Sequence, residues 1–159
     1  MRDVRLSIDL CTYNREDLLA DTMAELIPLL AAEPALRRII LVNQGQPFRH
    51  PILTALHETR GIEVVCQPNR SGCGGFARTM IETLCAAAPV THHLSMDDDI
   101  LFGARVVQRA IHFFGQTTRD VGLGGLSTEL EDRQCLHKAG AMVAKDRHYL
   151  PYEKGASLG

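Results

Sequence analysis

The 159-residue sequence contains no tryptophan, and only 5% of its residues are aromatic. It also has no long hydrophobic run, because its most apolar stretch, residues 23–32, is interrupted by Glu25 and Pro28 and is too short to span a bilayer. No basic stripe is present, and the formal net charge of -2 argues against a nucleic-acid binder held by bulk electrostatics. Repeats, low-complexity tracts and linkers are absent as well. We therefore expect one globular domain over residues 1–159, with 45% hydrophobic residues to build its core.

Paired cysteines are a further absence. The five cysteines form no CxxC motif and lie far apart, at positions 11, 66, 73, 85 and 135. An odd, scattered set is typical of reduced thiols in a cytosolic protein. The N-terminus has no signal-peptide hydrophobic region behind it. We therefore expect a cytoplasmic protein without disulfides and without a transmembrane segment.

Strand and helix patterns alternate along most of the chain. Four strands are expected at residues 6–11, 38–43, 62–66 and 92–96. The first expected helix is capped by Asn14 with Asp17 as a capping-box partner, and the second begins at Pro51. These successive β-α units predict an α/β fold, with a mainly parallel, Rossmann-like sheet and helices on both faces.

Two more helices and a pair of short strands complete the expected order. A glycine-rich loop at 68–75 opens the third helix, which is expected to run through Phe76, Met80, Ile81 and Leu84 and to end before Pro89. The fourth helix is expected around residues 105–114. Beyond it, residues 121–126 and 134–144 are predicted to be short strands joined by a polar turn at 128–133.

Three consecutive carboxylates, at positions 97–99, follow the fourth expected strand. Adjacent carboxylates repel one another, and packing gives no reason to place three together. A divalent cation removes that conflict, because hard oxygen ligands suit Mg²⁺ or Mn²⁺. At the C-terminal end of a strand the cluster would lie where open α/β sheets bind ligands. The alternative is a solvated acidic turn that caps the following helix.

Polar or glycine-rich segments follow the other three expected strands, at residues 12–15, 43–46 and 67–75. In a parallel sheet all of these segments emerge at the same edge as the carboxylates, so they meet in one crevice. Glycines before a helix also let backbone N–H groups approach an anion closely. The glycine segment matches neither the phosphate-binding loop nor the dinucleotide motif. Together the four segments predict a site for a nucleotide diphosphate.

Some charged residues near this crevice have simpler interpretations. Arg78, one turn into the third expected helix, has the alternative of a solvated surface charge. Arg15 is favoured for a phosphate or base contact because it follows a strand end. His92 and His93 should point to opposite faces of their strand, and we expect structural roles for both.

The order of these motifs resembles that of family 2 glycosyltransferases of the GT-A fold. The motifs are Thr-Tyr-Asn-Arg at 12–15, Val-Asn-Gln-Gly at 42–45, Gln-Pro-Asn-x-x-Gly-x-Gly-Gly-Phe-x-Arg-x-Met at 67–80 and Met-Asp-Asp-Asp-Ile at 96–100. The last two are most similar to the bacterial galactofuranosyltransferase branch, which polymerises galactan from UDP-galactofuranose. The resemblance spans residue 6 to about residue 140, where Gly-Gly at 124–125 and His-Lys-Ala-Gly at 137–140 also fit.

The resemblance implies a UDP-sugar donor, a glycan acceptor and a Mn²⁺ or Mg²⁺ cofactor. Asp97 and Asp99 would bind the cation that bridges the diphosphate, and Asp98 would support the donor. Thr12 and Arg15 would hold the uridine and phosphates, and Asn69 would contact the nucleotide. The full set of implied donor-binding residues is Thr12, Arg15, Gln44, Asn69, Gly74, Gly75, Arg78 and Asp98.

The sequence departs from the family pattern in several places. Many relatives carry Asp where this chain has Asn43, and Ser71 and Cys73 replace the usual Gly and Ser. The family places its catalytic base, a late metal-binding histidine and its acceptor-site tryptophans well downstream. We therefore expect the base to lie beyond Gly159 and the chain to be the donor-binding part of a longer enzyme. Parts beyond this chain would also supply any peripheral membrane association.

Two other function classes stay open at this stage. A nucleotidyltransferase also pairs acids with Mg²⁺, but it normally grips its triphosphate with basic residues in the first loop, where this chain offers only Arg15. A non-catalytic sugar-nucleotide-binding module is the other alternative. The leading interpretation is a metal-dependent inverting glycosyltransferase, in which a base deprotonates an acceptor hydroxyl.

Overall fold

The computed structural model describes residues 2–101, 103–129, 131–132, 134–138, 140–143, 149–152 and 155–157. The chain divides into two units, Met1–Arg119 and Asp120–Gly159. Each unit is described by itself below. No helix in the described ranges is long and apolar enough to cross a membrane.

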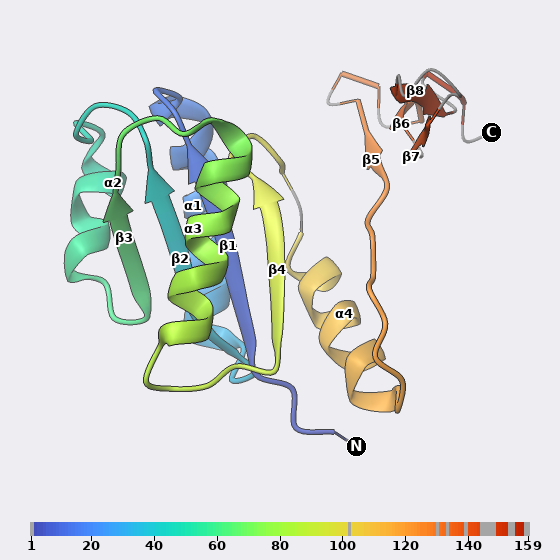
Figure 1. Cartoon of the computed structure of the whole chain (residues 1–159), viewed down its shortest axis with the longest axis horizontal. Coiled ribbons are helices and arrows are strands. Elements are labelled where there is room, and N and C mark those ends of the chain that lie inside the picture. The colour runs from blue at the N-terminus through green and yellow to red at the C-terminus, as the bar shows by residue number, and fades with distance from the viewer. Residues whose placement is uncertain are drawn as a thin grey trace. The chain divides into compact units, whose positions relative to one another are not determined.

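The first unit is built on a four-stranded sheet in which every neighbouring pair of strands is parallel. Its strands are β1 (Leu6–Thr12), β2 (Leu36–Asn43), β3 (Ile62–Cys66) and β4 (His92–Asp97). Their spatial order is β3-β2-β1-β4, so β1 lies inside the sheet between β2 and β4. The four arrowheads in Figure 1 point the same way, which brings the carboxyl ends of the strands to one edge.

Helices follow each strand and cover both faces of the sheet. They are α1 (Glu16–Ala32), α2 (Pro51–Thr54) with the 3₁₀ turn η1 (Ala55–Glu58), α3 (Ser71–Cys85) and α4 (Ala104–Gln116). Figure 1 shows α3 in front of the sheet and α1 behind it. The predicted α/β fold with a mainly parallel, helix-covered sheet is confirmed.

The hydrophobic core lies between the sheet and α1. One face of β1 and β2 contributes fully buried aliphatic residues, and α1 packs its own apolar stripe against them, as the 3.6-residue spacing of that stripe predicts. The buried residues of this layer include Ile8, Leu10, Ile39, Leu41, Leu19, Met23 and Leu26. This layer fixes where the carboxyl ends of β1 and β2 lie.

The opposite face of the sheet meets α3 through small and polar side chains. Gly75, Thr79 and Thr83 are the buried residues of α3. Thr83 donates a hydrogen bond to the carboxylate of Asp9, which is fully buried in β1. Ser7 donates a second hydrogen bond to the same carboxylate, at 2.6 Å. Burial raises the pKa of Asp9, and these hydroxyl donors together with the charge of a nearby histidine offset part of that rise.

The helix predicted through Phe76, Met80, Ile81 and Leu84 is confirmed as α3, but these apolar residues do not form its buried face. Met80, Ile81 and Leu84 are exposed, Leu84 to 84% of its surface, and Phe76 is only half-buried. The physical reason is that α3 approaches β1 closely where that strand presents Asp9 and Cys11, which selects glycine and threonine rather than bulky side chains. The glycine segment was also predicted as a loop through residue 75, whereas α3 begins at Ser71.

The start of α1 differs from the prediction as well. Arg15, not Asn14, occupies the N-cap position, and no side chain caps the helix. Asn14 has a left-handed backbone with φ of 55°, and its Oδ1 accepts a hydrogen bond from the Gln46 N–H at 2.9 Å. Asn14 therefore joins the β1–α1 and β2–α2 loops instead of capping the helix.

In its described residues, the second unit contains two pairs of short antiparallel strands. They are β5 (Ser127–Thr128) with β6 (Leu136–Lys138), and β7 (Gly140–Val143) with β8 (Tyr149–Tyr152). The strand predicted at residues 121–126 is absent, since those described residues form no ladder and strand pairing begins at Ser127. The strand predicted at 134–144 is two strands, β6 and β7; Ala139 and Ala144 lie outside the described residues.

Candidate functional site

Four strand ends converge at the carboxyl edge of the sheet, as predicted. Cys11 of β1 lies in register with Asp97 of β4, and Thr12 lies in register with Asn43 of β2. Asn43 is in turn in register with Cys66, the last residue of β3. The residues that follow these strands therefore share one edge of the molecule.

The acidic cluster, Asp97, Asp98 and Asp99, begins at the last residue of β4 and continues into a turn. Its three members differ in exposure. Asp98 is buried, with 5% of its surface exposed, whereas Asp97 and Asp99 are exposed. This alternation sends the middle carboxylate inward and leaves its two neighbours facing solvent. A purely solvated turn would not bury a carboxylate in this way.

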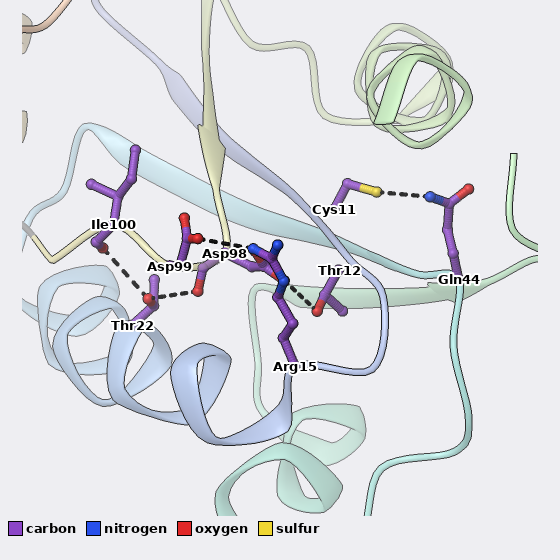
Figure 2. A network of polar contacts seen from close by, with 8 residues as sticks. All are labelled: Cys11, Thr12, Arg15, Thr22, Gln44, Asp98, Asp99 and Ile100. Atoms are coloured by element: carbon purple, nitrogen blue, oxygen red, sulfur yellow. Dashed lines mark hydrogen bonds and ion pairs between the residues drawn. The ribbon is translucent and has the colours of Figure 1, made fainter. Parts of the chain in front are cut away.

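The buried carboxylate of Asp98 is held by two residues from the β1 side. The Thr12 hydroxyl donates a hydrogen bond to Asp98 Oδ2 at 2.6 Å, and Thr12 is itself 2% exposed. The Arg15 guanidinium lies 3.4 Å from Asp98 Oδ1. Figure 2 shows these side chains converging from the β1–α1 loop and the end of β4.

The backbone of the same turn is tied to α1. The Thr22 hydroxyl donates to the Asp98 carbonyl at 3.0 Å and lies 3.4 Å from the Ile100 carbonyl. Sequence reasoning missed Thr22, although a hydroxyl among the buried apolar positions of a helix was a signal that it had a polar partner. Because the turn is held from two directions, its carboxylates are fixed in place.

Arg15 also pairs with the exposed member of the cluster. Its Nη1 lies 2.8 Å from Asp99 Oδ2, and its side chain is 53% exposed. One guanidinium therefore pairs with two of the three carboxylates, and the acidic cluster keeps an excess of negative charge. Such a cluster attracts cations, or an anion accompanied by a cation.

The β3–α3 turn and the start of α3 form the other side of this edge. Ser71 has a left-handed backbone with φ of 60°, and its N–H donates to Asn69 Oδ1 at 2.8 Å. Gln44, the residue after β2, is buried and lies against this turn, where its Nε2 donates to the Ser71 carbonyl at 3.0 Å.

The two predicted donor-binding glycines have packing roles in the structure. A Cβ on Gly75 would lie 2.0 Å from Cys11 Sγ, and a Cβ on Gly74 would lie 2.3 Å from the Cβ of Arg70. Neither glycine has a positive φ. A side chain at either position would therefore meet neighbouring atoms rather than strain the backbone. Close approach of α3 to β1 is the reason the structure gives for Gly75.

Other residues named in the sequence analysis make their contacts away from the acidic cluster. Arg78 forms an ion pair with Glu82 one turn along α3. His92 packs its ring against Phe114, with ring centroids 4.4 Å apart, which agrees with the structural role expected for it. The side chain of Asn43 binds its own loop, accepting from the Gly45 N–H at 2.8 Å and donating to the Gln46 carbonyl at 2.9 Å.

Cys11 is half-buried between the sheet and α3, next to the cluster. Burial raises the pKa of its thiol, and the charges of Asp98 and Asp97 raise it further, while the hydrogen bond from Gln44 opposes them. These effects together favour the protonated form of the thiol.

The donor chemistry of the cluster suits a hard cation, since it consists of carboxylate oxygens. Within the described ranges, however, no three or more His, Cys, Asp and Glu side chains are grouped so that they could hold a metal ion. Any cation at this edge would take only part of its coordination from those residues.

A comparison with known proteins found a distant similarity to a glycosyltransferase. No protein-family model matches the sequence. The chain is 28% identical over 144 residues to the galactofuranosyltransferase GlfT2 of Mycobacterium tuberculosis. The matched region covers 87% of this chain but 22% of that relative, so the chain spans about a fifth of the length of the protein that it matches. The similarity indicates a distant glycosyltransferase relationship.

Proposed function

We propose that this chain is the nucleotide-sugar-binding part of a metal-dependent inverting glycosyltransferase. The donor would be a UDP-sugar carrying galactofuranose, and the acceptor would be a glycan. The observation that carries the proposal is the held carboxylate turn at the carboxyl edge of the sheet, where Thr12 and Arg15 meet Asp98. The similarity to a galactofuranosyltransferase over 87% of the chain supports the reaction class.

Burial divides the roles within the acidic cluster. Asp98 is committed to the Thr12 hydroxyl and buried, so its proposed role is to fix the turn and support the donor. Asp97 and Asp99 are exposed on either side of it and would hold Mn²⁺ or Mg²⁺. The remaining ligands would come from the diphosphate and water, as is usual for Mg²⁺ sites. When bound, the cation would neutralise charge on the departing nucleoside diphosphate.

Arg15 is the residue best placed to respond to the donor. Its half-exposed guanidinium pairs with Asp99, and a phosphate oxygen offers the same planar, charge-assisted hydrogen bonds as a carboxylate. A bound donor would therefore draw Arg15 from the carboxylate to the phosphates and leave Asp99 to the cation. Asn69, exposed in the β3–α3 turn, would contact the nucleotide. The base that deprotonates the acceptor hydroxyl is not assigned within this chain.

The test is calorimetric titration of UDP into the chain, in Mn²⁺ and separately in EDTA. We expect affinity in the high micromolar range or weaker, roughly -5 kcal/mol, and only when Mn²⁺ is present. Asp99→Asn should abolish the gain in UDP affinity that Mn²⁺ gives, whereas Asp21→Asn, at an exposed acid of α1, should keep that gain. Equal UDP binding in EDTA and in Mn²⁺ would contradict the proposed role of the metal.

A further inference from the structure

Gln44 makes an unusually complete set of contacts for a side chain at a strand end. It follows β2 directly, and only 5% of its surface is exposed. Its Nε2 donates to the Ser71 carbonyl at 3.0 Å and to Cys11 Sγ at 3.2 Å. Its Oε1 accepts from the Arg70 backbone N–H at 2.8 Å and from Gln67 Nε2 at 2.9 Å. One amide thus contacts β1, the end of β3 and the start of α3.

The backbone partners fix which way this amide points. The Ser71 carbonyl can only accept a hydrogen bond, and the Arg70 N–H can only donate one. Exchanging the nitrogen and oxygen of Gln44 would break both contacts. The two donor hydrogens and two acceptor sites of the amide are therefore all used by the protein, which leaves Gln44 no hydrogen bond to give to a ligand.

The segment that Gln44 holds needs such support. Ser71 has a φ of 60°, a left-handed conformation that a residue with a side chain keeps only when its surroundings determine it. Asn69 Oδ1 accepts from the Ser71 N–H, so the conformation of Ser71 also sets where the Asn69 side chain lies. Gln67 adds a second link, because its Nε2 lies 3.3 Å from the Gly74 carbonyl within the first turn of α3.

We propose that Gln44 is a positioning residue for the donor site rather than a donor contact. By holding the backbone of Arg70 and Ser71, it sets the β3–α3 turn and the first turn of α3 at the carboxyl edge of the sheet, facing the diphosphate. The ligand role of that turn rests on the proposed function. The positioning itself is a property of the free protein and is measurable without any nucleotide.

The first experiment measures amide hydrogen exchange in the free protein by NMR. Gln44→Met keeps the approximate length of the side chain but removes all four hydrogen bonds. We expect the Arg70 amide to exchange at least about tenfold faster in this variant, because its acceptor is lost, while the amide protons of β1 keep their parent rates. The matched control is Gln46→Met, at an exposed glutamine two residues on. An unchanged Arg70 rate in Gln44→Met would overturn the proposal.

The second experiment compares affinities for UDP and for uridine, in Mn²⁺, by NMR titration. If Gln44 positions the turn that faces the diphosphate, Gln44→Met should weaken UDP binding by roughly tenfold and uridine binding by less than about twofold. A merely structural role would weaken both equally, and that result would refute the positioning role in binding. Should Gln44→Met fail to fold, Gln67→Met is the second variant, because it removes one of the four hydrogen bonds to Gln44. It should speed exchange of the Arg70 amide and weaken UDP binding, each by less than Gln44→Met would. If neither the exchange rate nor the UDP affinity changes in Gln67→Met, the proposal is refuted as well.

The two experiments separate the two claims. If the parent binds no uridine nucleotide, the proposed function fails, and the exchange rates still decide whether Gln44 holds the turn. If the parent binds UDP but Gln44→Met binds it equally well, the donor site stands and the positioning role falls.

Discussion

Removing the Thr12 hydroxyl should destabilise the fold, because that hydroxyl donates to a buried carboxylate. Thr12→Val keeps the shape of the side chain and leaves Asp98 Oδ2 without its 2.6 Å donor. Hydrogen bonds to charged groups contribute about 1.5–3 kcal/mol, and a buried acceptor left unpaired loses about that much. We expect a loss of about 2 kcal/mol in the free energy of unfolding. For a chain of this size that is a fall of roughly 4–8 °C in melting temperature.

The assay is thermal unfolding followed by circular dichroism, with urea unfolding to obtain the free energy. Thr12→Ser retains the hydroxyl and should recover most of the loss. Thr54→Val is the matched control, since Thr54 is exposed and its hydroxyl bonds only the Pro51 carbonyl. If Thr12→Val melts within about 1 °C of the parent, the contact between Thr12 and Asp98 does not stabilise the carboxylate turn, and our account of that turn is wrong.

Three further predictions follow from single contacts. Burial raises the pKa of Asp9 above 3.8, so the native state binds the proton more tightly than the unfolded state does. The contribution of this residue to stability should therefore fall as pH rises from about 4 through its raised pKa. Urea unfolding over a pH series should show this fall in the parent and not in Asp9→Asn. Gly75→Ala should lower the free energy of unfolding in urea by about 1–3 kcal/mol, because its Cβ would meet Cys11 Sγ. Cys11→Ala added to this variant should recover part of the loss. The control Gly72→Ala, whose Cβ has nothing within 4 Å, should cause no loss. Arg15→Gln should weaken UDP binding several-fold in calorimetry and should lower the melting temperature by less than Thr12→Val does, since the half-exposed Arg15 lies 3.4 Å from Asp98 whereas the buried Thr12 lies at 2.6 Å, and its other ion pair, with Asp99, is exposed.

The sheet and the convergence of the strand ends were predictable because they depend on local patterns. Apolar runs such as those at 38–43 and 62–66 alternate with stretches whose apolar residues have helical spacing, and this alternation predicts a parallel α/β sheet. Parallel strands must then bring their carboxyl ends together. The position of the acidic cluster followed from that rule alone.

The face of α3 could not be predicted in the same way. Met80 and Leu84 recur at helical spacing, but β1 presents Ser7 and Asp9 to α3, and the helix buries Thr79 and Thr83 instead. Hydrophobic periodicity carries no information about a polar layer formed between two elements that are distant in sequence.

The separate roles of the site residues could also be assigned only from the structure. Whether Gln44 contacts a ligand or holds a turn depends on four partners from different segments, and no spacing in the sequence encodes them. The same is true of Asp98, because its burial depends on Thr12, which lies beside it at the end of the neighbouring strand β1.

Paramagnetic broadening by Mn²⁺ tests the central claim most directly, because it reports where the cation lies and whether the nucleotide is needed to hold it there. Amide signals of the isotope-labelled chain are recorded with saturating UDP while substoichiometric Mn²⁺ is added. We predict that broadening is strongest at Asp97 and Asp99, weaker at Thr12 and Arg15, and absent without UDP at the same Mn²⁺ concentration. Broadening centred elsewhere in the chain, or broadening that is the same with and without UDP, would contradict a metal-dependent donor site at this edge.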